Sequence, residues 1–198
     1  MLKSEVANLT PLTRRLFWED MYIRDFDAKV ITAVGNKVVL DQTAFNPKGG
    51  GLVSDTGTIN GLELAEVVKE GEEIIHMLER PTTLKAGEAV HCVLDWNRRY
   101  RIMRMHTAAH ILSAIVNKET GALITGNQIA PVESRVDLSL DQFDREKLAH
   151  YVELVNDVVQ RAVEVETLFM KREQVLATPG LVKLAAAAQL NGVLHEAG

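Results

Sequence analysis

The stretch DWNRRYRIMRMHTAAHILSAIV, residues 95–116, predicts a long helix and marks the point where the pattern of the chain changes. Its apolar side chains recur at the three-then-four spacing of one helix face: Ile102, Met105, Ala109, Leu112 and Val116. Asp95 stands directly before this pattern, where its carboxylate can accept hydrogen bonds from the free amides of the first turn. A second, helical part of the chain therefore begins here.

The residues before this helix predict strands joined by tight turns. Two glycine-containing pairs between apolar or β-branched runs are typical of hairpin turns: Gly35-Asn36 within residues 28–41 and Asn60-Gly61 within residues 57–68. Apolar runs over residues 72–78 and 89–94 predict further short strands. Residues 1–94 are therefore expected to form an all-β subdomain that is barrel-like or sandwich-like.

The residues after the helix predict a mixture of helices and strands. A second helix is predicted over residues 144–162, with an inner face of four apolar side chains: Leu148, Val152, Val155 and Val159. Residues 134–140 and 163–170 predict strands, and residues 171–177 predict a short helix that precedes a break and a last helical piece. Residues 95–198 are therefore expected to form an α+β subdomain, with helices that cover a sheet.

Length and composition are those of a globular protein of the cell interior. The 198 residues include 46% hydrophobic side chains, enough for a buried core in one large or two small domains. A net charge of −5 argues against a protein whose whole surface binds nucleic acid, although a local basic patch would escape this average. The single cysteine, Cys92, excludes an intrachain disulfide. No apolar stretch has signal-peptide or membrane-span length, so we expect a soluble cytoplasmic protein.

Two histidines on the predicted long helix have the spacing of metal ligands. His106 and His110 are four residues apart, so both rings lie on one helix face and can reach a single metal ion. Two ligands do not complete a catalytic zinc site, which usually has three protein ligands and a water. The alternative is a pair of ordinary surface or buried histidines. Thr107 stands where metalloproteases of this spacing carry a glutamate, which disfavours peptide hydrolysis.

Four arginines precede these histidines: Arg98, Arg99, Arg101 and Arg104. They lie on several faces of the helix, so some of them must point away from the core. Guanidinium groups beside a metal site would suit a phosphate-rich substrate such as RNA. A solvated helix face, paired with nearby carboxylates, explains the same arginines equally well.

A glycine-rich stretch, DQTAFNPKGGGLVSDTG at residues 41–57, is the other conspicuous feature. Gly49, Gly50 and Gly51 can adopt positive φ angles and let a ligand approach the backbone closely, with amides free to donate. Their spacing matches neither the Walker motif nor the dinucleotide-binding motif, which disfavours a nucleotide-phosphate site. A plain loop between strands is the alternative.

Taken together, TAFNPKGGGLVSDTG and the later DWNRRYRIMRMHTAAHIL resemble motifs of the editing domain of alanyl-tRNA synthetase. They resemble still more closely the free-standing alanyl-tRNA editing proteins of the AlaX type. VESRVDLSLD and PGLVKL extend the resemblance to roughly residues 15–185. It implies a β-barrel-like subdomain followed by an α+β editing core shared with threonyl-tRNA synthetase. It also implies zinc-dependent hydrolysis, in trans, of tRNA(Ala) wrongly charged with serine and often with glycine.

The resemblance assigns roles to individual residues. His106 and His110 match the zinc ligands of the family motif, and Thr43 matches the threonine implicated in recognising the serine hydroxyl. The resemblance also implies that the Gly49, Gly50 and Gly51 loop lines the aminoacyl pocket. Among the arginines, Arg98 and Arg104 are candidates for contacts with tRNA phosphates.

Two departures from the family pattern bear on these roles. Leu52 replaces the usual glutamine after the glycine triplet, which leaves the choice between serine and glycine open. The family's C-x-G-x-H-type segment, which supplies the remaining zinc ligands, is not found. Three explanations stay open: a truncated sequence, His195 as a substitute ligand, or a non-catalytic tRNA-binding or interaction module.

Overall fold

The computed structural model describes residues 12–140, 142, 144–166 and 168–178. By backbone contacts the chain divides into two compact units, each described here by itself. The first unit consists of Met1–Gly49 and Val53–Arg99, and the second of Gly50–Leu52 and Tyr100–Gly198. The division falls within the first turns of the long helix. Gly50–Leu52, which the sequence pattern placed in the β subdomain, belongs with the second unit.

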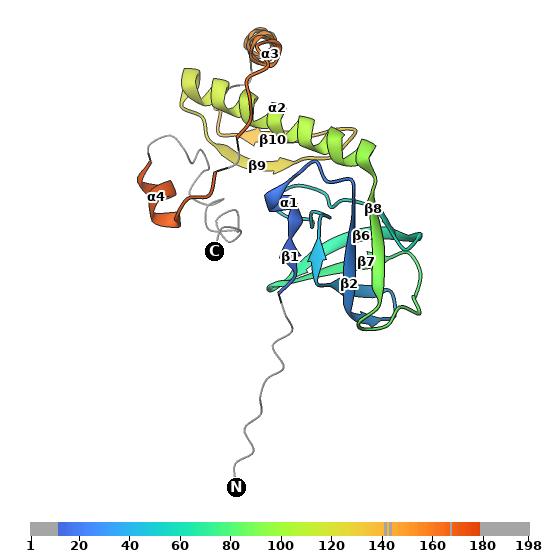
Figure 1. The fold of residues 1–198 in the computed structure, drawn as a ribbon. Coiled ribbons are helices and arrows are strands. Elements are labelled where there is room, and N and C mark those ends of the chain that lie inside the picture. Colours follow the sequence, from blue (N-terminus) through green and yellow to red (C-terminus); the bar gives the residue numbers. More distant parts are fainter. Residues whose placement is uncertain (1–11, 141, 143, 167, 179–198) are drawn as a thin grey trace. The chain divides into compact units, whose positions relative to one another are not determined.

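Six strands of the first unit close into an antiparallel barrel, in the order β2-β3-β7-β6-β5-β8. Figure 1 labels four of these strands, β2, β6, β7 and β8. Their bounds are β2 (Asp25–Val34), β3 (Lys37–Leu40), β5 (Gly57–Ile59), β6 (Leu62–Glu70), β7 (Glu73–Leu78) and β8 (Ala89–Leu94). Both predicted hairpin turns are confirmed. Gly35 has a φ of 61°, and Asn60 and Gly61 have φ values of 49° and 76°. These positive angles give a two-residue turn the twist that joins neighbouring strands.

The barrel interior is filled by one face of each strand. Along β2, exposed and buried side chains alternate from Asp25 to Val30, as expected for a strand with one face toward a closed interior. Phe45 is fully buried and packs edge-to-face on Phe26, with 5.4 Å between ring centroids. Cys92 lies in the same core, and burial raises the pKa of its thiol to about 12. This thiol is therefore an inert core side chain.

A short segment before the barrel lies against the strand that leads to the glycine-rich loop. β1 (Arg14–Arg15) pairs in parallel with β4 (Gln42–Thr43), and α1 (Leu16–Glu19) follows at once. Leu16 and Phe17 of α1 are buried in the barrel core. The segment thereby fixes the backbone on which Thr43 stands.

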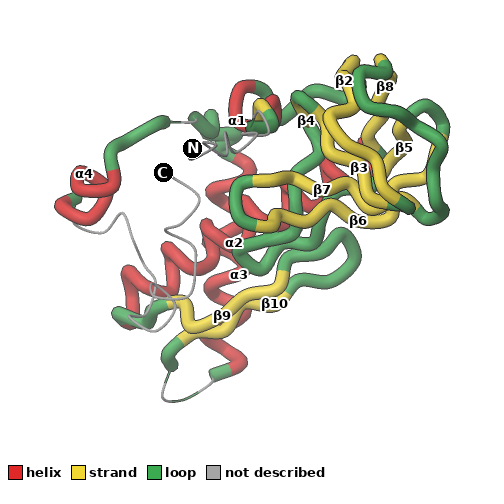
Figure 2. Tube along the Cα trace, turned by 90° about the horizontal axis from the view of Figure 1, so that it is seen from below, coloured by secondary structure: helices red, strands yellow, loops and turns green. Residues whose placement is uncertain are grey.

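The second unit combines three described helices with a two-stranded sheet. Its elements are α2 (Trp96–Thr120), which starts in the first unit, β9 (Ile124–Gln128), β10 (Arg135–Leu138), α3 (Arg145–Gln160) and α4 (Arg172–Ala177). Figure 2 shows β9 and β10 as one antiparallel ribbon. α2, α3 and α4 confirm the predicted helices, and β10 confirms the predicted strand over residues 134–140. The mixed α and β content is therefore as expected, whereas β9 was not predicted.

Two features of the second unit differ from the sequence-based expectation. The predicted strand over residues 163–170 is wrong, because its described residues, 163–166 and 168–170, are not in a strand. A strand needs a partner for its backbone groups, and the described part of the sheet ends at two strands. The predicted inner face of α3 is also largely wrong, since Leu148, Val152 and Val159 are exposed while Tyr151 is buried.

Two further expectations can be compared with the described residues only in part. The break and last helical piece after residue 178, together with His195, lie outside the described residues, apart from Thr178, which follows α4. Among the described residues, no helix combines the length and apolar character needed to cross a membrane.

Candidate functional site

A buried ion pair lies at the base of the glycine-rich loop. Asp55 is 3% exposed and Arg99, in the first turn of α2, is 5% exposed. Arg99 Nε donates to both carboxylate oxygens of Asp55 at 2.9 Å. The Arg99 guanidinium also donates to the backbone carbonyl oxygens of Met21 and Ala44. One side chain therefore ties together three segments that are distant in the sequence.

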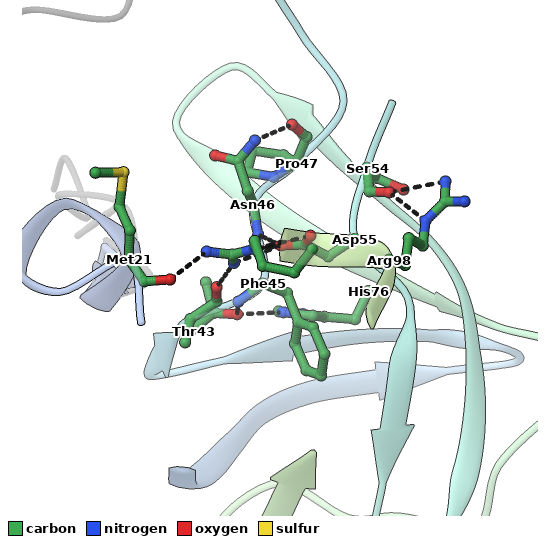
Figure 3. A network of polar contacts seen from close by, with 11 residues as sticks. Met21, Thr43, Phe45, Asn46, Pro47, Ser54, Asp55, His76 and Arg98 are labelled. Carbon is green, nitrogen blue, oxygen red and sulfur yellow. Dashed lines mark hydrogen bonds and ion pairs between the residues drawn. The ribbon is translucent and has the colours of Figure 1, made fainter. Parts of the chain in front are cut away.

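The two ends of the glycine-rich loop are joined by a reciprocal pair of hydrogen bonds. The amide of Asn46 donates to Asp55 Oδ2 at 2.6 Å, and the amide of Asp55 donates to the carbonyl of Asn46 at 3.1 Å (Figure 3). Within the loop, the Lys48 amide donates to the carbonyl of Val67 in β6 at 2.9 Å. The base of the loop is thus held by the barrel, independently of any ligand.

Thr43 is fully buried and hydrogen-bonded to a buried histidine, His76 of β7 (Figure 3). His76 Nδ1 lies 3.1 Å from the carbonyl oxygen of Val38, which can only accept, so Nδ1 carries the proton. Nε2 then accepts from the Thr43 hydroxyl, 2.9 Å away. Burial lowers the pKa of His76 to about 4, which keeps the ring neutral. The amide of Phe45 donates to the same hydroxyl oxygen at 3.1 Å.

In the second unit, His106 and His110 bring their rings together on one face of α2. Their Nε2 atoms are 2.9 Å apart, and the ring centroids are 4.7 Å apart. Burial and the neighbouring His110 ring both lower the pKa of His106. The 2.9 Å contact is a hydrogen bond between the two rings. Two zinc-bound nitrogens in a tetrahedral site are about 3.4 Å apart, so the rings would separate by about half an ångström to share an ion. The described residues contain no group of three or more side chains that could hold a metal.

The segment after Gly50 pairs with the end of β9 within the second unit. Leu52 forms a parallel bridge with Ile129, whose amide donates to the carbonyl of Gly51 at 2.8 Å. Gly51 has a φ of 86°, and a Cβ placed there would lie 1.5 Å from Asn127 Oδ1. That Oδ1 is buried and, among the described residues, has no hydrogen-bond partner. Only glycine fits this close approach.

Comparisons with known proteins identify the family. A family model described as tRNA synthetases class II (A) matches residues 18–98. The chain is 38% identical to the alanyl-tRNA editing protein AlaX-M of Saccharolobus solfataricus over 181 residues, which covers 88% of this chain and 75% of that protein. The chain belongs to the AlaX family of alanyl-tRNA editing proteins.

Two further relatives are a second editing protein and a ligase. It is 42% identical to AlaX-M of Methanosarcina acetivorans over 176 residues, which cover 82% of this chain and 71% of that protein. It is 34% identical to the alanine–tRNA ligase of Sulfurisphaera tokodaii over 178 residues, which cover 86% of this chain but 20% of the ligase. The similarity to the ligase is therefore confined to a part of it.

The predicted site residues of this AlaX chain fall into both units. Thr43 and Gly49 belong to the first unit, whereas Gly50, Gly51 and the histidine pair belong to the second. The structure brings His106 and His110 together, and it brings Thr43 to His76. The proton of the Thr43 hydroxyl and one of its lone pairs are already committed within the barrel.

The four arginines of the predicted tRNA contact differ in their surroundings. Arg99 is excluded from any phosphate contact, because its guanidinium is buried against Asp55. Arg98 is half-buried and donates to the carbonyl of Ser54 at 3.1 and 3.2 Å (Figure 3). Arg104 is exposed, with its Cζ 6.0 Å from the centroid of Tyr100, and Arg101 is also exposed. Arg101 and Arg104 are therefore the accessible members of the set.

The sequence patterns did not point to three residues that organise the site: Asp55, Asn127 and His76. The sequence patterns carry no signal for these residues, because each meets its partner only after strands far apart in the chain have paired. His76 is a core residue with both ring nitrogens hydrogen-bonded.

Proposed function

We propose that this AlaX protein is an editing hydrolase that deacylates tRNA(Ala) mischarged with serine, and also with glycine, by means of zinc. The observation that carries the proposal is the convergence of His106 and His110 in a chain whose relatives are named alanyl-tRNA editing proteins. Such a reaction would take place in the cytoplasm, where aminoacylated tRNA is used.

A separate editing step is needed because the amino acids differ so little. A pocket that accepts alanine cannot exclude the smaller glycine by size. A pocket that merely tolerates an added hydroxyl rejects serine by only about 10²-fold. A second site that selects serine by its hydroxyl supplies the missing discrimination, and hydrolysis removes the wrong product.

Two histidine side chains supply part of the ligand set that a zinc ion needs. His106 and His110 would hold it through Nε2, since these two atoms already converge. A zinc ion held there would supply Lewis-acid chemistry, either polarising the ester carbonyl or lowering the pKa of a bound water to about 7. Among the described residues, no third His, Cys, Asp or Glu joins these two histidines in a group that could hold a metal.

Thr43 would select the serine hydroxyl through its one free lone pair, once the substrate reaches this buried side chain. Its proton goes to His76 and one lone pair accepts from Phe45, so a further partner can only donate to it. A hydroxyl of serine would donate in this way, with a net gain of about 1 kcal/mol that alanine cannot make. The Gly49, Gly50 and Gly51 loop, anchored at Asn46 and Asp55, would line the same aminoacyl pocket.

The test compares two aminoacyl esters on the same tRNA. Zinc-loaded protein should release serine from Ser-tRNA(Ala) faster than alanine from Ala-tRNA(Ala). His106→Ala and His110→Ala should abolish this difference and reduce the bound zinc. His150→Ala is the matched control, because His150 is an exposed histidine of α3 in the same unit. A folded, zinc-loaded sample that releases neither amino acid would disprove the enzyme proposal.

A second candidate function follows from the incomplete ligand set among the described residues. In this alternative the chain is a non-catalytic tRNA-binding or interaction module of the same family. It would bind tRNA(Ala) with a steep salt dependence, hold no zinc and release no amino acid. The zinc content of the purified protein distinguishes the two candidates directly.

A further inference from the structure

A cluster of two aromatic rings and one arginine lies on the first unit. We call it the aromatic platform, and it consists of Tyr22, Arg24 and Trp96. The rings of Tyr22 and Trp96 are 5.9 Å apart between centroids and tilted by 45°. The Cζ of Arg24 lies over the Trp96 ring at 4.5 Å from its centroid. The three side chains therefore form a continuous surface of flat groups.

The aromatic platform is accessible from solvent. Tyr22 is 60% exposed, Arg24 is exposed and Trp96 is half-buried. Among the described residues, no ion pair involves Arg24, whose guanidinium lies over the Trp96 indole. The pair of Arg15 and Trp18 is different, because the Arg15 side chain is only 11% exposed and forms an ion pair with Glu72. Tyr22 is not part of the barrel core, so its ring is free to contact a ligand.

The backbone that carries the aromatic platform is held firmly. The amide of Tyr22 donates to the carboxylate of Asp20 at 2.7 Å, and the carbonyl of Arg24 accepts from the amide of Leu94 at 2.8 Å. The carbonyl of Met21 accepts from the buried Arg99. A surface fixed in advance in this way loses little conformational entropy when a ligand binds.

We propose that the aromatic platform binds unpaired nucleotides at the acceptor end of the tRNA substrate. Bases stack on tyrosine, tryptophan and guanidinium planes, and each stacked base contributes a substantial free energy whatever its identity. Paired bases are already stacked within a duplex, so exposed rings favour single-stranded RNA. The proposal rests on the proposed function, because the ester to be hydrolysed is on the terminal, unpaired nucleotide of tRNA.

Tryptophan fluorescence gives a direct readout of stacking. The chain has two tryptophans, so Trp18→Phe leaves Trp96 as the sole reporter. A single-stranded oligoribonucleotide that ends in CCA should quench Trp96 saturably, and a blunt RNA duplex of equal charge should not. Tyr22→Ala should weaken binding of the oligoribonucleotide at least fivefold, as expected for about 1 kcal/mol or more from one stacked base.

Matched variants separate stacking from unfolding and from charge. Tyr22→Phe keeps the ring and should bind like the parent, while thermal melting verifies that Tyr22→Ala is folded. Arg24→Gln should weaken binding, whereas Arg80→Gln, which removes an exposed arginine elsewhere in the first unit, should not. Equal affinities of Tyr22→Ala and the parent, or equal binding of the blunt duplex, would overturn the proposal. RNA-independent self-association through Tyr22 would overturn it too.

Deacylation assays on the same variants separate this proposal from the proposed function. If Tyr22 and Arg24 are needed for RNA binding but no variant releases serine, the aromatic platform stands and the editing proposal fails. If the parent releases serine and Tyr22→Ala has an unchanged KM, the editing proposal stands and the aromatic platform fails. A raised KM in Tyr22→Ala with little change in kcat supports both.

Discussion

Arg99 and Asp55 form a buried, bidentate ion pair between the first turn of α2 and the end of the glycine-rich loop. Arg99 has further partners at the carbonyls of Met21 and Ala44, so its charge is satisfied on several sides. Arg98, the preceding residue of the same helix, bonds to a single carbonyl at Ser54. Two neighbouring arginines therefore have different roles, and the buried one organises the loop.

Removing one partner of this ion pair should destabilise the first unit strongly. Arg99→Met leaves the Asp55 carboxylate buried without its counter-charge, and such a change costs about 3–5 kcal/mol. Urea unfolding of the variant should show this loss, and Arg101→Met, at an exposed position of α2, should change stability little. A loss below about 1 kcal/mol would mean that the pair is open to solvent.

The Thr43 hydroxyl should contribute to stability as well as to substrate choice. Thr43→Val keeps the shape of the side chain but leaves His76 Nε2 buried without a donor, which costs about 1–3 kcal/mol. Thr43→Ser keeps the donor and should be closer to the parent in chemical denaturation. If valine and serine at this position are equally stable, the hydrogen bond to His76 contributes nothing.

The buried His76 predicts a specific pH dependence of stability. Its pKa is about 4 in the folded protein, below the ordinary value of 6.5. Between these two values the unfolded chain binds more protons, so the free energy of unfolding falls as the pH is lowered through this window. Above pH 6.5 the ring is neutral in both states, so it does not alter the free energy of unfolding. By pH 4 the protonation of His76 in the unfolded chain has lowered that free energy by up to about 3 kcal/mol.

A variant without the titrating ring isolates this effect from the carboxylates of the chain. His76→Gln should show a shallower fall in unfolding free energy between pH 7 and pH 4 than the parent, measured by denaturant titration in steps of about half a pH unit. Parallel slopes for the parent and His76→Gln would contradict the buried, neutral state.

Two neighbouring glycines should respond differently to the same substitution. Gly50→Ala introduces a Cβ into open space at a φ of 57°, for a cost of about 1–2 kcal/mol from the backbone alone. Gly51→Ala must also displace Asn127, whose side-chain oxygen would be 1.5 Å away. We expect a clearly larger loss of stability for Gly51→Ala in thermal unfolding. Equal losses would show that the Gly51 segment does not pair with β9.

Short-range rules explain the features that the sequence predicted correctly. The turns at Gly35 and at Asn60-Gly61 depend on which residues tolerate a positive φ, and this is a property of the residues themselves. The start of α3 follows from Asp144, whose side chain accepts from the amides of Glu146 and Lys147. The convergence of His106 and His110 follows from the helical period alone.

Long-range pairing explains the features that the sequence patterns missed. Residues 163–170 alternate like a strand, yet the described residues of this segment have no partner strand and stay outside the sheet. Thr43 meets His76, Arg99 meets Asp55 and Leu52 meets Ile129 only because distant backbone segments align in one register. Local conformation depends on a few neighbouring residues and can be read from them. The burial of a side chain and its hydrogen-bond or ion-pair partner depend on the closed barrel and on the packing of the second unit. They are therefore decided only when the chain has folded.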